Sequence, residues 1–330
     1  MGFWLHWYFQ LNPEMRKVFC IGEALIDFVA EKQGSDLSRA KEFTRKAGGA
    51  PANVACAIAK LGGRSSFIGS VGDDPFGTYL LGVLSDAGVD ISLAQRSETF
   101  TTLAFVSLAA DGERDFVFSR GADRELQYKS SVKAQFQGNM IHLGAATALL
   151  GGKLEEAYMH YFFDALNEKT FISFDPNFRQ DLWKNKEKDF VRKCLPFISK
   201  AHLCKFSMEE AFLLSGKDTL PEACDVLHHA GVRIITITLG SEGTYLSTPN
   251  GRHTIASVKI KAVDTTGAGD AFIGCLLYRL AATNSLEAIF EKDDLLIEMI
   301  GMANKAGAIT TTNYGAIESL PGLDQLQAFV

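Results

Sequence analysis

Several features are missing from this chain, and each absence excludes a class of protein. No apolar run reaches the length needed to cross a membrane. Its 330 residues hold 33 Lys and Arg against 39 Asp and Glu, so a net charge of −6 lacks the basic footprint of a nucleic-acid binder. The cysteines form no CxxC pair, which predicts reduced thiols in a cytoplasmic protein rather than a disulfide framework. They are Cys20, Cys56, Cys194, Cys204, Cys224 and Cys275.

Familiar ligand motifs are missing as well. There is no GxxxxGK[ST] loop and no GxGxxG after a predicted strand, which excludes P-loop and dinucleotide-binding proteins. His142, His228 and His229 have no spacing to other residues that suits a metal. Residues 1–14 lack the basic start and cleavage site of a signal peptide, and we treat them as an extension before Met15.

What is present is a regular alternation of short apolar segments and amphipathic ones. Strands separated by helices predict right-handed βαβ units, hence an α/β fold with a mostly parallel sheet. With no repeat or linker, 15–330 should form a single domain. The predicted strands are Lys17–Ile21, Ser65–Val71, Met140–Leu143, Phe171–Phe174, His202–Phe206, Arg233–Thr238 and the hairpin Gly243–Ser247 with Arg252–Ile255. The predicted helices are Pro51–Leu61, Pro75–Ala87, Lys153–Glu168, Lys186–Ile198, Glu209–Leu214, Pro221–His229, Ala271–Ala281, Leu286–Phe290 and Asp294–Thr310.

A second, smaller β layer is predicted outside that sheet. Thr101–Ala109 and Asp115–Phe118 flank Asp111-Gly112, a dipeptide typical of tight hairpin turns. Together with the segment after Asp27, this hairpin predicts a β lid formed by about 27–46 and 100–120.

The strongest chemical signal is a glycine-rich turn, Asp264 to Asp270 (DTTGAGD), that leads into an apolar helix. Backbone N–H groups of such a turn converge on an anion, and the helix dipole adds positive potential there. Asp270 would lie in the first helical turn beside that anion, where it could take a proton from a hydroxyl group. The alternative is that Asp270 merely caps the helix.

A second signal, Gly48 to Ala55 (GGAPANVA), places a diglycine before a helix that begins with proline. Asn53 then lies in the first turn, where its amide could bind sugar hydroxyls, or could be only a polar residue at a helix start.

Together, GGAPANVACAIAKLGG and DTTGAGDAF resemble the two signatures of the pfkB carbohydrate kinases, in the family's order and spacing. The resemblance covers roughly Lys17 to Leu320. It implies a ribokinase-like fold, a twisted, mostly parallel sheet in a Rossmann-like three-layer arrangement with a β lid. It also implies an enzyme that uses ATP and Mg²⁺ to phosphorylate a sugar.

The resemblance assigns roles to the residues of both motifs. It makes Asp270 the catalytic base, and Gly267, Ala268 and Gly269 the anion hole, with the two glycines also binding ATP. GEALID is similar to the family segment whose aspartate binds sugar hydroxyls, here Asp27, and a carboxylate can accept two such hydrogen bonds. Gly48, Gly49 and Asn53 complete that side of the sugar site.

FDPNFR resembles the family's DPNxR segment, whose arginine, here Arg179, faces substrate or phosphate. A structural salt bridge is the alternative for Arg179. SMEE stands where the family has NxxE, a segment linked to Mg²⁺ and phosphate. Glu210 matches its glutamate, whereas Ser207 replaces the asparagine. Ser207 and Glu210 also fit a helix capping box, and both roles are compatible.

The remaining nucleotide and cation contacts follow from weaker matches. TLGSEG resembles a nucleotide-binding stretch and implies ATP contacts for Thr238, Gly240 and Gly243. Asn304 matches a position that borders adenine. A K⁺ site, built partly from residues around Asp264 and Thr266, is a further expectation.

The lid hairpin resembles the lid strands of the family. Phe105, Phe118 and Arg120 are therefore expected to touch the sugar from above, although aromatic residues on a hairpin often serve packing instead. Lid-mediated homodimers occur among relatives, so a dimer through the lid is an expectation.

The start GEALIDF, the APAN motif and FDPNFR look most like fructokinases, which make fructose 6-phosphate. A 2-keto-3-deoxygluconate kinase is the alternative, with Arg120 and Arg179 as partners for its acidic substrate. Ribokinase is further away, because its first motif differs. A homologue that binds sugar without catalysis would have no physical need for Asp270.

Overall fold

The computed structural model describes residues 15–31, 34, 36–108 and 114–329. Within them, eight strands form one sheet in the order β14-β13-β12-β11-β10-β9-β1-β4. Neighbours from β12 to β4 run parallel, and the hairpin of β13 and β14 is antiparallel at one edge. The mostly parallel sheet predicted from the sequence is confirmed. The strands are β1 (Lys17–Ile21), β4 (Arg64–Ile68), β9 (Met140–Gly144), β10 (Phe171–Asp175), β11 (Leu203–Ser207), β12 (Ile234–Thr238), β13 (Thr244–Thr248) and β14 (Gly251–Ile255).

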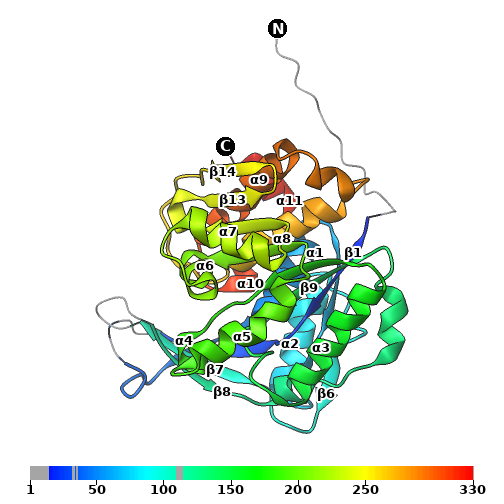
Figure 1. Ribbon diagram of the computed structural model, residues 1–330. Helices are drawn as coiled ribbons and strands as arrows, with labels where there is room; N and C mark the ends of the chain where they lie inside the picture. Colours follow the sequence, from blue (N-terminus) through cyan, green and yellow to red (C-terminus); the bar gives the residue numbers. More distant parts are fainter. Residues whose placement is uncertain (1–14, 32–33, 35, 109–113, 330) are drawn as a thin grey trace.

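Helices cover both faces of this sheet, which gives three layers (Figure 1). Because strand side chains alternate, Val18 and Cys20 of β1 join one core while Phe19 and Ile21 join the other. The first core includes α1 (Ala50–Lys60), α2 (Pro75–Asp86), α8 (Ala268–Ala281) and α9 (Asp294–Thr310). The second includes α3 (Gly152–Asn167), α5 (Glu187–Ile198), α6 (Met208–Ser215) and α7 (Leu220–Ala230).

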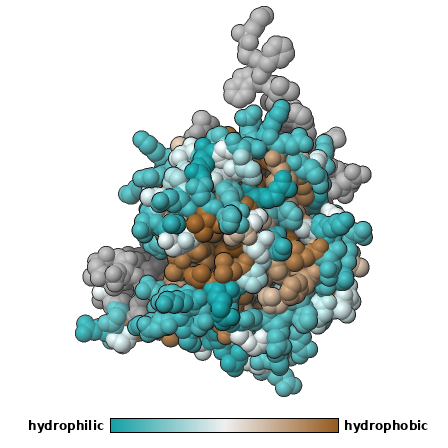
Figure 2. Space-filling model, in the orientation of Figure 1, coloured by the Kyte–Doolittle hydropathy of each residue, from teal (hydrophilic) through white to brown (hydrophobic). Residues whose placement is uncertain are grey.

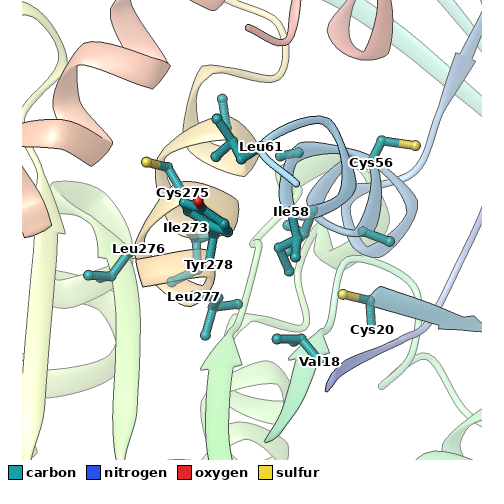
Figure 3. Packing of buried hydrophobic residues seen from close by; sticks show 14 of the residues in the cluster. Val18, Cys20, Cys56, Ile58, Leu61, Ile273, Cys275, Leu276, Leu277 and Tyr278 are labelled. Atoms are coloured by element: carbon teal, nitrogen blue, oxygen red, sulfur yellow. The ribbon is translucent and has the colours of Figure 1, made fainter. Parts of the chain in front are cut away.

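The two helices that begin at the glycine motifs, α1 and α8, pack against each other beside β1 (Figure 3). Their contact is close because α1 is rich in alanine and meets a glycine, Gly274, on α8. This packing fixes the starts of both helices relative to one another. Cys20, Cys56 and Cys275 lie in this core, and all six cysteines are free and buried.

A second sheet forms the predicted lid, in the order β3-β2-β7-β8. Its strands are β2 (Leu25–Ala30), β3 (Phe43–Gly48), β7 (Leu103–Leu108) and β8 (Arg114–Ser119). The sheet is mixed, because β2 pairs with β7 in parallel while the other two pairs are antiparallel. The lid sheet extends to one side of the body (Figure 1). On the face of the molecule shown in Figure 2, hydrophobic residues gather across the middle. The predicted Asp111-Gly112 turn and the extension at 1–14 lie outside the described residues.

The sequence prediction differs from the structure in a few short elements. The predicted strand Ser65–Val71 is two strands, because the chain leaves the main sheet after β4, and β5 (Ser70–Gly72) pairs with β6 (Gln95–Ser97) instead. Glu287–Phe290 is a 3₁₀ helix rather than an α-helix. Three short helices were not predicted: α4 (Gln180–Trp183), α10 (Ala316–Ser319) and α11 (Leu323–Ala328). In the described part of the chain, every helix is too short or too polar to span a membrane.

Candidate active site

A cavity of about 430 Å³ lies at the carboxyl ends of the central strands, between the lid and the starts of α1 and α8. Parallel sheets bind ligands at this edge. The cavity brings together most of the residues singled out in the sequence. Those that line it are Asp27, Gly49, Asn53, Phe118, Arg179, Ser207, Glu210, Thr266, Gly267, Gly269 and Asp270.

The glycine-rich turn before α8 is held in shape by Asp264. One carboxylate oxygen accepts hydrogen bonds from the backbone N–H and hydroxyl of Thr266, at 3.0 and 2.7 Å, and the other accepts from the Gly315 N–H at 3.0 Å. Gly267 caps the helix at a φ of 79°, where a Cβ would lie 2.7 Å from that of Ala316. Within the predicted anion hole, the Ala268 N–H donates to the Thr265 carbonyl at 3.3 Å.

Asp270 lies in the first turn of α8, and its Oδ2 accepts a hydrogen bond from Asn53 Nδ2 at 2.8 Å. Burial raises the pKa of Asp270 to about 6, against the opposing effects of this hydrogen bond and the positive charges of Lys205 and Arg179. A carboxylate with a pKa near the working pH is suited to accept a proton. The other amide atom, Asn53 Oδ1, is buried with no hydrogen-bond partner among the described residues.

The start of α1 is fixed by Glu23, which the sequence reasoning missed. Glu23 is 1% exposed, and its carboxylate accepts hydrogen bonds from the Ala50 N–H at 3.3 Å and the Thr147 hydroxyl at 3.2 Å. Burial raises its pKa to about 7. Gly49 has a φ of 103°, and a Cβ there would lie 2.6 Å from the Glu23 carbonyl oxygen. The signal available in the sequence was the position of Glu23, a carboxylate that follows the buried strand β1 after Gly22.

The lid contributes Asp27, Phe116 and Phe118 to the cavity. The two phenylalanine rings stack with centroids 6.1 Å apart. Phe105 pairs with Val117, so the register places it on the opposite face of the lid from Phe118, where it stacks on Phe28 at 5.3 Å. It does not line the cavity.

Arg120 also differs from expectation. Its Nε and Nη2 donate to Asp123 Oδ2 at 3.1 and 2.7 Å, and Arg120 is absent from the described lining of the cavity. Asp123 itself is buried, so this pair is a structural salt bridge. Arg179 lines the cavity, and its Nη1 donates to the Phe178 carbonyl at 3.1 Å.

Ser207 and Glu210 form the expected capping box at the start of α6. One Glu210 oxygen accepts from the Ser207 N–H at 2.7 Å and the other from the Phe178 N–H at 2.6 Å. Burial raises the pKa of Glu210. Among the described residues, no three His, Cys, Asp or Glu side chains cluster in a way that could hold a metal ion.

Lys205 and Asp175 are a pair that the sequence reasoning missed as well. Lys205 is 7% exposed and lines the cavity, and its Nζ donates to Asp175 Oδ2 at 3.0 Å. The available signal was a lysine inside the apolar strand LCKFS. Because an unpaired charge is too costly to bury, a lysine at such a position implies a buried carboxylate partner.

Of the residues predicted to contact the nucleotide, Ser207, Gly267 and Gly269 line the cavity, whereas Thr238, Gly240, Gly243 and Asn304 lie outside its lining. Asn304 Oδ1 accepts from the Thr244 hydroxyl at 2.6 Å, and its Nδ2 donates to the Ile255 carbonyl at 2.9 Å. Asn304 therefore ties α9 to the edge hairpin. Thr238 ends β12, while Gly240 and Gly243 follow it with φ values of 58° and 109°. Gly48 lies against the Asp27 carboxylate, and Asp264 accepts hydrogen bonds from the turn before α8. Neither residue is part of the cavity lining.

The geometry agrees with what comparison with known proteins shows. The pfkB family carbohydrate kinase profile matches residues 15–323. Fructokinase-1 of Zea mays is 37% identical over 309 residues, which is 92% of this chain and 94% of the relative. The chain belongs to the pfkB family, and it is a carbohydrate kinase.

Solved structures support the same class. A fructokinase with bound ATP from Xylella fastidiosa superposes with a TM-score of 0.85 at 28% identity, over 95% of this chain and 98% of that one. A double mutant of the fructokinase from Vibrio cholerae O395, with fructose, ADP and potassium ion bound, superposes with a TM-score of 0.80 at 28% identity, over 96% of this chain and 99% of that one. The ribokinase-like fold with a β lid is thereby confirmed.

Proposed function

We propose that this protein is a fructokinase, which transfers the γ-phosphoryl group of ATP to the primary 6-hydroxyl of fructose. One observation carries the proposal: the hydrogen-bonded pair of Asn53 and Asp270 faces the same cavity as Asp27 of the lid. A base beside a helix N-terminus and a hydroxyl-binding carboxylate opposite it are the parts that a sugar kinase needs. The fructokinase names of the relatives support the choice of sugar.

In the proposed mechanism Asp270 accepts the proton of the sugar hydroxyl as its oxygen attacks the γ-phosphorus. The P–O bond to ADP breaks, and ADP leaves with the electron pair of that bond. The glycine turn and the dipole of α8 stabilise the charge on the transferring group. Phe116 and Phe118 of the lid cover the sugar and exclude water, which would otherwise compete for the phosphoryl group.

The site also fits Mg²⁺ carried by ATP. Mg²⁺ usually keeps several waters and binds one or two carboxylates together with substrate phosphates. Glu209 and Glu210 both line the cavity, and Glu210 uses its oxygens on backbone N–H groups. We therefore expect these two residues to hold the ion through water. Bound there, Mg²⁺ would neutralise charge on the β- and γ-phosphates.

The charges of the cavity favour a neutral sugar over 2-keto-3-deoxygluconate. Asp27, from the lid, lines the cavity, and a carboxylate substrate there would meet its negative charge. Of the two arginines considered for an acidic substrate, Arg120 is neutralised by Asp123 and Arg179 alone faces the cavity. A single guanidinium that also lies near Asp270 is a weak basis for recognising an acid.

Three further expectations belong to this proposal. ATP would extend from the glycine turn past Thr238, Gly240 and Gly243. K⁺ would bind near Asp264 and Thr266, where the turn is already ordered. Dimerisation would cover the lid, whose outer strands leave open edges and where Val117 is 51% exposed.

The test is ADP release with Mg·ATP against fructose, ribose, 2-keto-3-deoxygluconate, glucose and adenosine. Coupling to phosphoglucose isomerase and glucose-6-phosphate dehydrogenase reports fructose 6-phosphate in particular. We expect strong preference for fructose and a signal in the coupled assay. Preference for the keto-deoxy acid would replace the substrate assignment, and no turnover with any compound would contradict the proposed activity.

A further inference from the structure

The floor of the cavity holds a buried lysine that none of the roles described so far uses. Lys205 is the third residue of β11, a strand whose other members from Leu203 to Phe206 are buried and apolar. An ammonium group at such a position requires compensation, because burying an isolated charge is very costly. Asp175, at the end of the neighbouring strand β10, supplies it through the hydrogen bond of 3.0 Å.

Three carboxylates surround this ammonium group. Burial alone would lower the pKa of Lys205, but the charges of Asp175, Glu210 and Asp270 outweigh it and raise the pKa. Lys205 is therefore a fixed positive charge throughout the physiological range. The carboxylates themselves come from three separate elements, β10, α6 and α8, so the fold concentrates negative charge around one lysine.

The position of the ammonium group decides what it can do. A Cβ built on Gly269 would lie 3.2 Å from Lys205 Nζ, so the lysine tip lies against the glycine turn at the start of α8. Lys205, Gly269 and Asp270 all line the same cavity. An ammonium group has three donors, and the described contacts of Nζ use one, the bond to Asp175. The remaining donors lie next to the turn where the proposed function requires a phosphoryl group.

We propose that Lys205 is a further catalytic residue, whose ammonium group, anchored by Asp175, binds an oxygen of the γ-phosphoryl group of ATP and keeps that contact during transfer. The inference rests on the proposed kinase function. Lys205 neither gains nor loses a proton in the step; the hydroxyl proton goes to Asp270 and the phosphoryl group to the sugar oxygen. A lysine suits this task as a point charge that can follow the moving group.

Removing Lys205 alone would leave buried carboxylates without compensation, which is strongly destabilising. The test therefore uses a double variant, Asp175→Asn with Lys205→Met, which removes both charges of the pair. Asparagine keeps an oxygen where Asp175 Oδ1 accepts the Asn177 N–H at 3.2 Å. Lys205→Arg keeps the charge and provides a second variant. Lys193→Met is the matched control, because Lys193 is also paired to a carboxylate, Glu155, but lies outside the cavity.

Two measurements separate a phosphate contact from a structural role. By calorimetry with Mg²⁺, the double variant should lose at least about tenfold in affinity for the β,γ-imido analogue of ATP and keep its affinity for ADP. Its kcat should fall by about 10²–10³-fold, as when one oxyanion donor is removed. Lys205→Arg should recover part of the rate, and Lys193→Met should match the wild type in both measurements.

Unchanged affinity for the imido analogue with a kcat close to that of the wild type would overturn the inference. Equal losses of affinity for ADP and for the imido analogue would also overturn it, because they would indicate general damage to the site. The calorimetry needs no sugar. If the wild type phosphorylates none of the sugars tested, the proposed function fails while the contact of Lys205 is still measured.

Discussion

Asn53 and Asp270 are 217 residues apart in the chain, yet the amide of one donates to the carboxylate of the other at 2.8 Å. The two residues lie in the first turns of α1 and α8, whose packing beside β1 sets this distance. From the sequence, the Asn53 amide was expected to bind sugar hydroxyls or to be only a polar group at a helix start. The structure gives its Nδ2 a partner in Asp270, so the residue predicted to bind sugar and the residue predicted to act as the base are joined by a direct hydrogen bond.

Replacing the base should separate binding from chemistry. With Asp270→Ala or Asp270→Asn, we expect turnover to fall by about 10²–10⁴-fold, the usual contribution of a positioned base. Affinity for ATP and sugar should change little, because neither substitution removes the glycine turn or Asp27. Calorimetry and steady-state kinetics on the same preparations measure both quantities. Near-normal turnover would show that Asp270 is not the catalytic base.

Removing the amide should change the pH dependence. Asp270 accepts a proton only when ionised, so kcat/KM should rise with pH through the pKa of about 6 that Asp270 has in the free enzyme, and level off above it. The hydrogen bond from Asn53 lowers that pKa. Asn53→Ala should therefore move the rise in kcat/KM to higher pH, and Asn53→Asp should move it further because it adds a like charge. The measurement is kcat/KM for sugar and for ATP against pH. An unchanged midpoint in both variants would mean that Asn53 does not tune the base.

How far the sequence alone predicts this protein depends on whether a feature is local. The strand Lys17–Ile21 and the helix Asp294–Thr310 are predicted to the residue, because apolar period, glycine and capping signals lie within each segment. Asp270 and the glycine turn are predicted for the same reason. The partners of these residues are not local. That Arg120 would bind Asp123, or that Phe105 would face away from Phe118, depends on strand register and on side-chain competition in the folded lid.

Buried charges show the same limit more clearly. Lys205 is visible in the sequence as a lysine in an apolar strand, but its compensation by Asp175 depends on two strands being neighbours in the sheet. Glu23 is visible as a carboxylate after β1, but its partners Ala50 and Thr147 come from distant segments. A single sequence gives the chemistry of each residue and leaves its surroundings open.

Gly48 offers a test of the sugar side that leaves the phosphate side intact. A Cβ at Gly48 would lie 2.1 Å from Asp27 Oδ2, and its φ is outside the left-handed region, so alanine is compatible with the backbone. Gly48→Ala should displace the Asp27 carboxylate and raise the KM for sugar by about tenfold or more, a loss of about 1.4 kcal/mol. The KM for ATP should change little. Gly301→Ala is the control, since no atom lies within 4 Å of its Cβ. A sugar KM close to that of the wild type would argue against a role for Asp27 in binding.

Glu23 should make stability depend on pH in a defined direction. Its pKa is about 7 in the folded protein and about 4.5 when unfolded, so the unfolded state releases the proton first as pH rises. Protonated Glu23 is compatible with folding at low pH; between about pH 4.5 and 7 the penalty for its charge grows, and above pH 7 it is complete. Glu23→Gln removes the charge and keeps the shape. We expect it to raise the free energy of unfolding at pH 8 by about 1–3 kcal/mol, with a difference that shrinks towards zero near pH 4.

Urea unfolding of wild type and Glu23→Gln from pH 4 to 8 measures this difference directly. Glu156→Gln, on the exposed side of α3, is the control and should leave the stability unchanged at every pH. A variant less stable than wild type at pH 8 would mean that the ionised carboxylate stabilises the start of α1 through Ala50 and Thr147 more than burial disfavours it. The expected result would instead identify Glu23 as a residue retained at a cost in stability, which is common where a site holds buried polar groups in a fixed geometry. In that case Glu23→Gln should gain stability and lose sugar affinity together, because the same carboxylate positions the segment that carries Asn53.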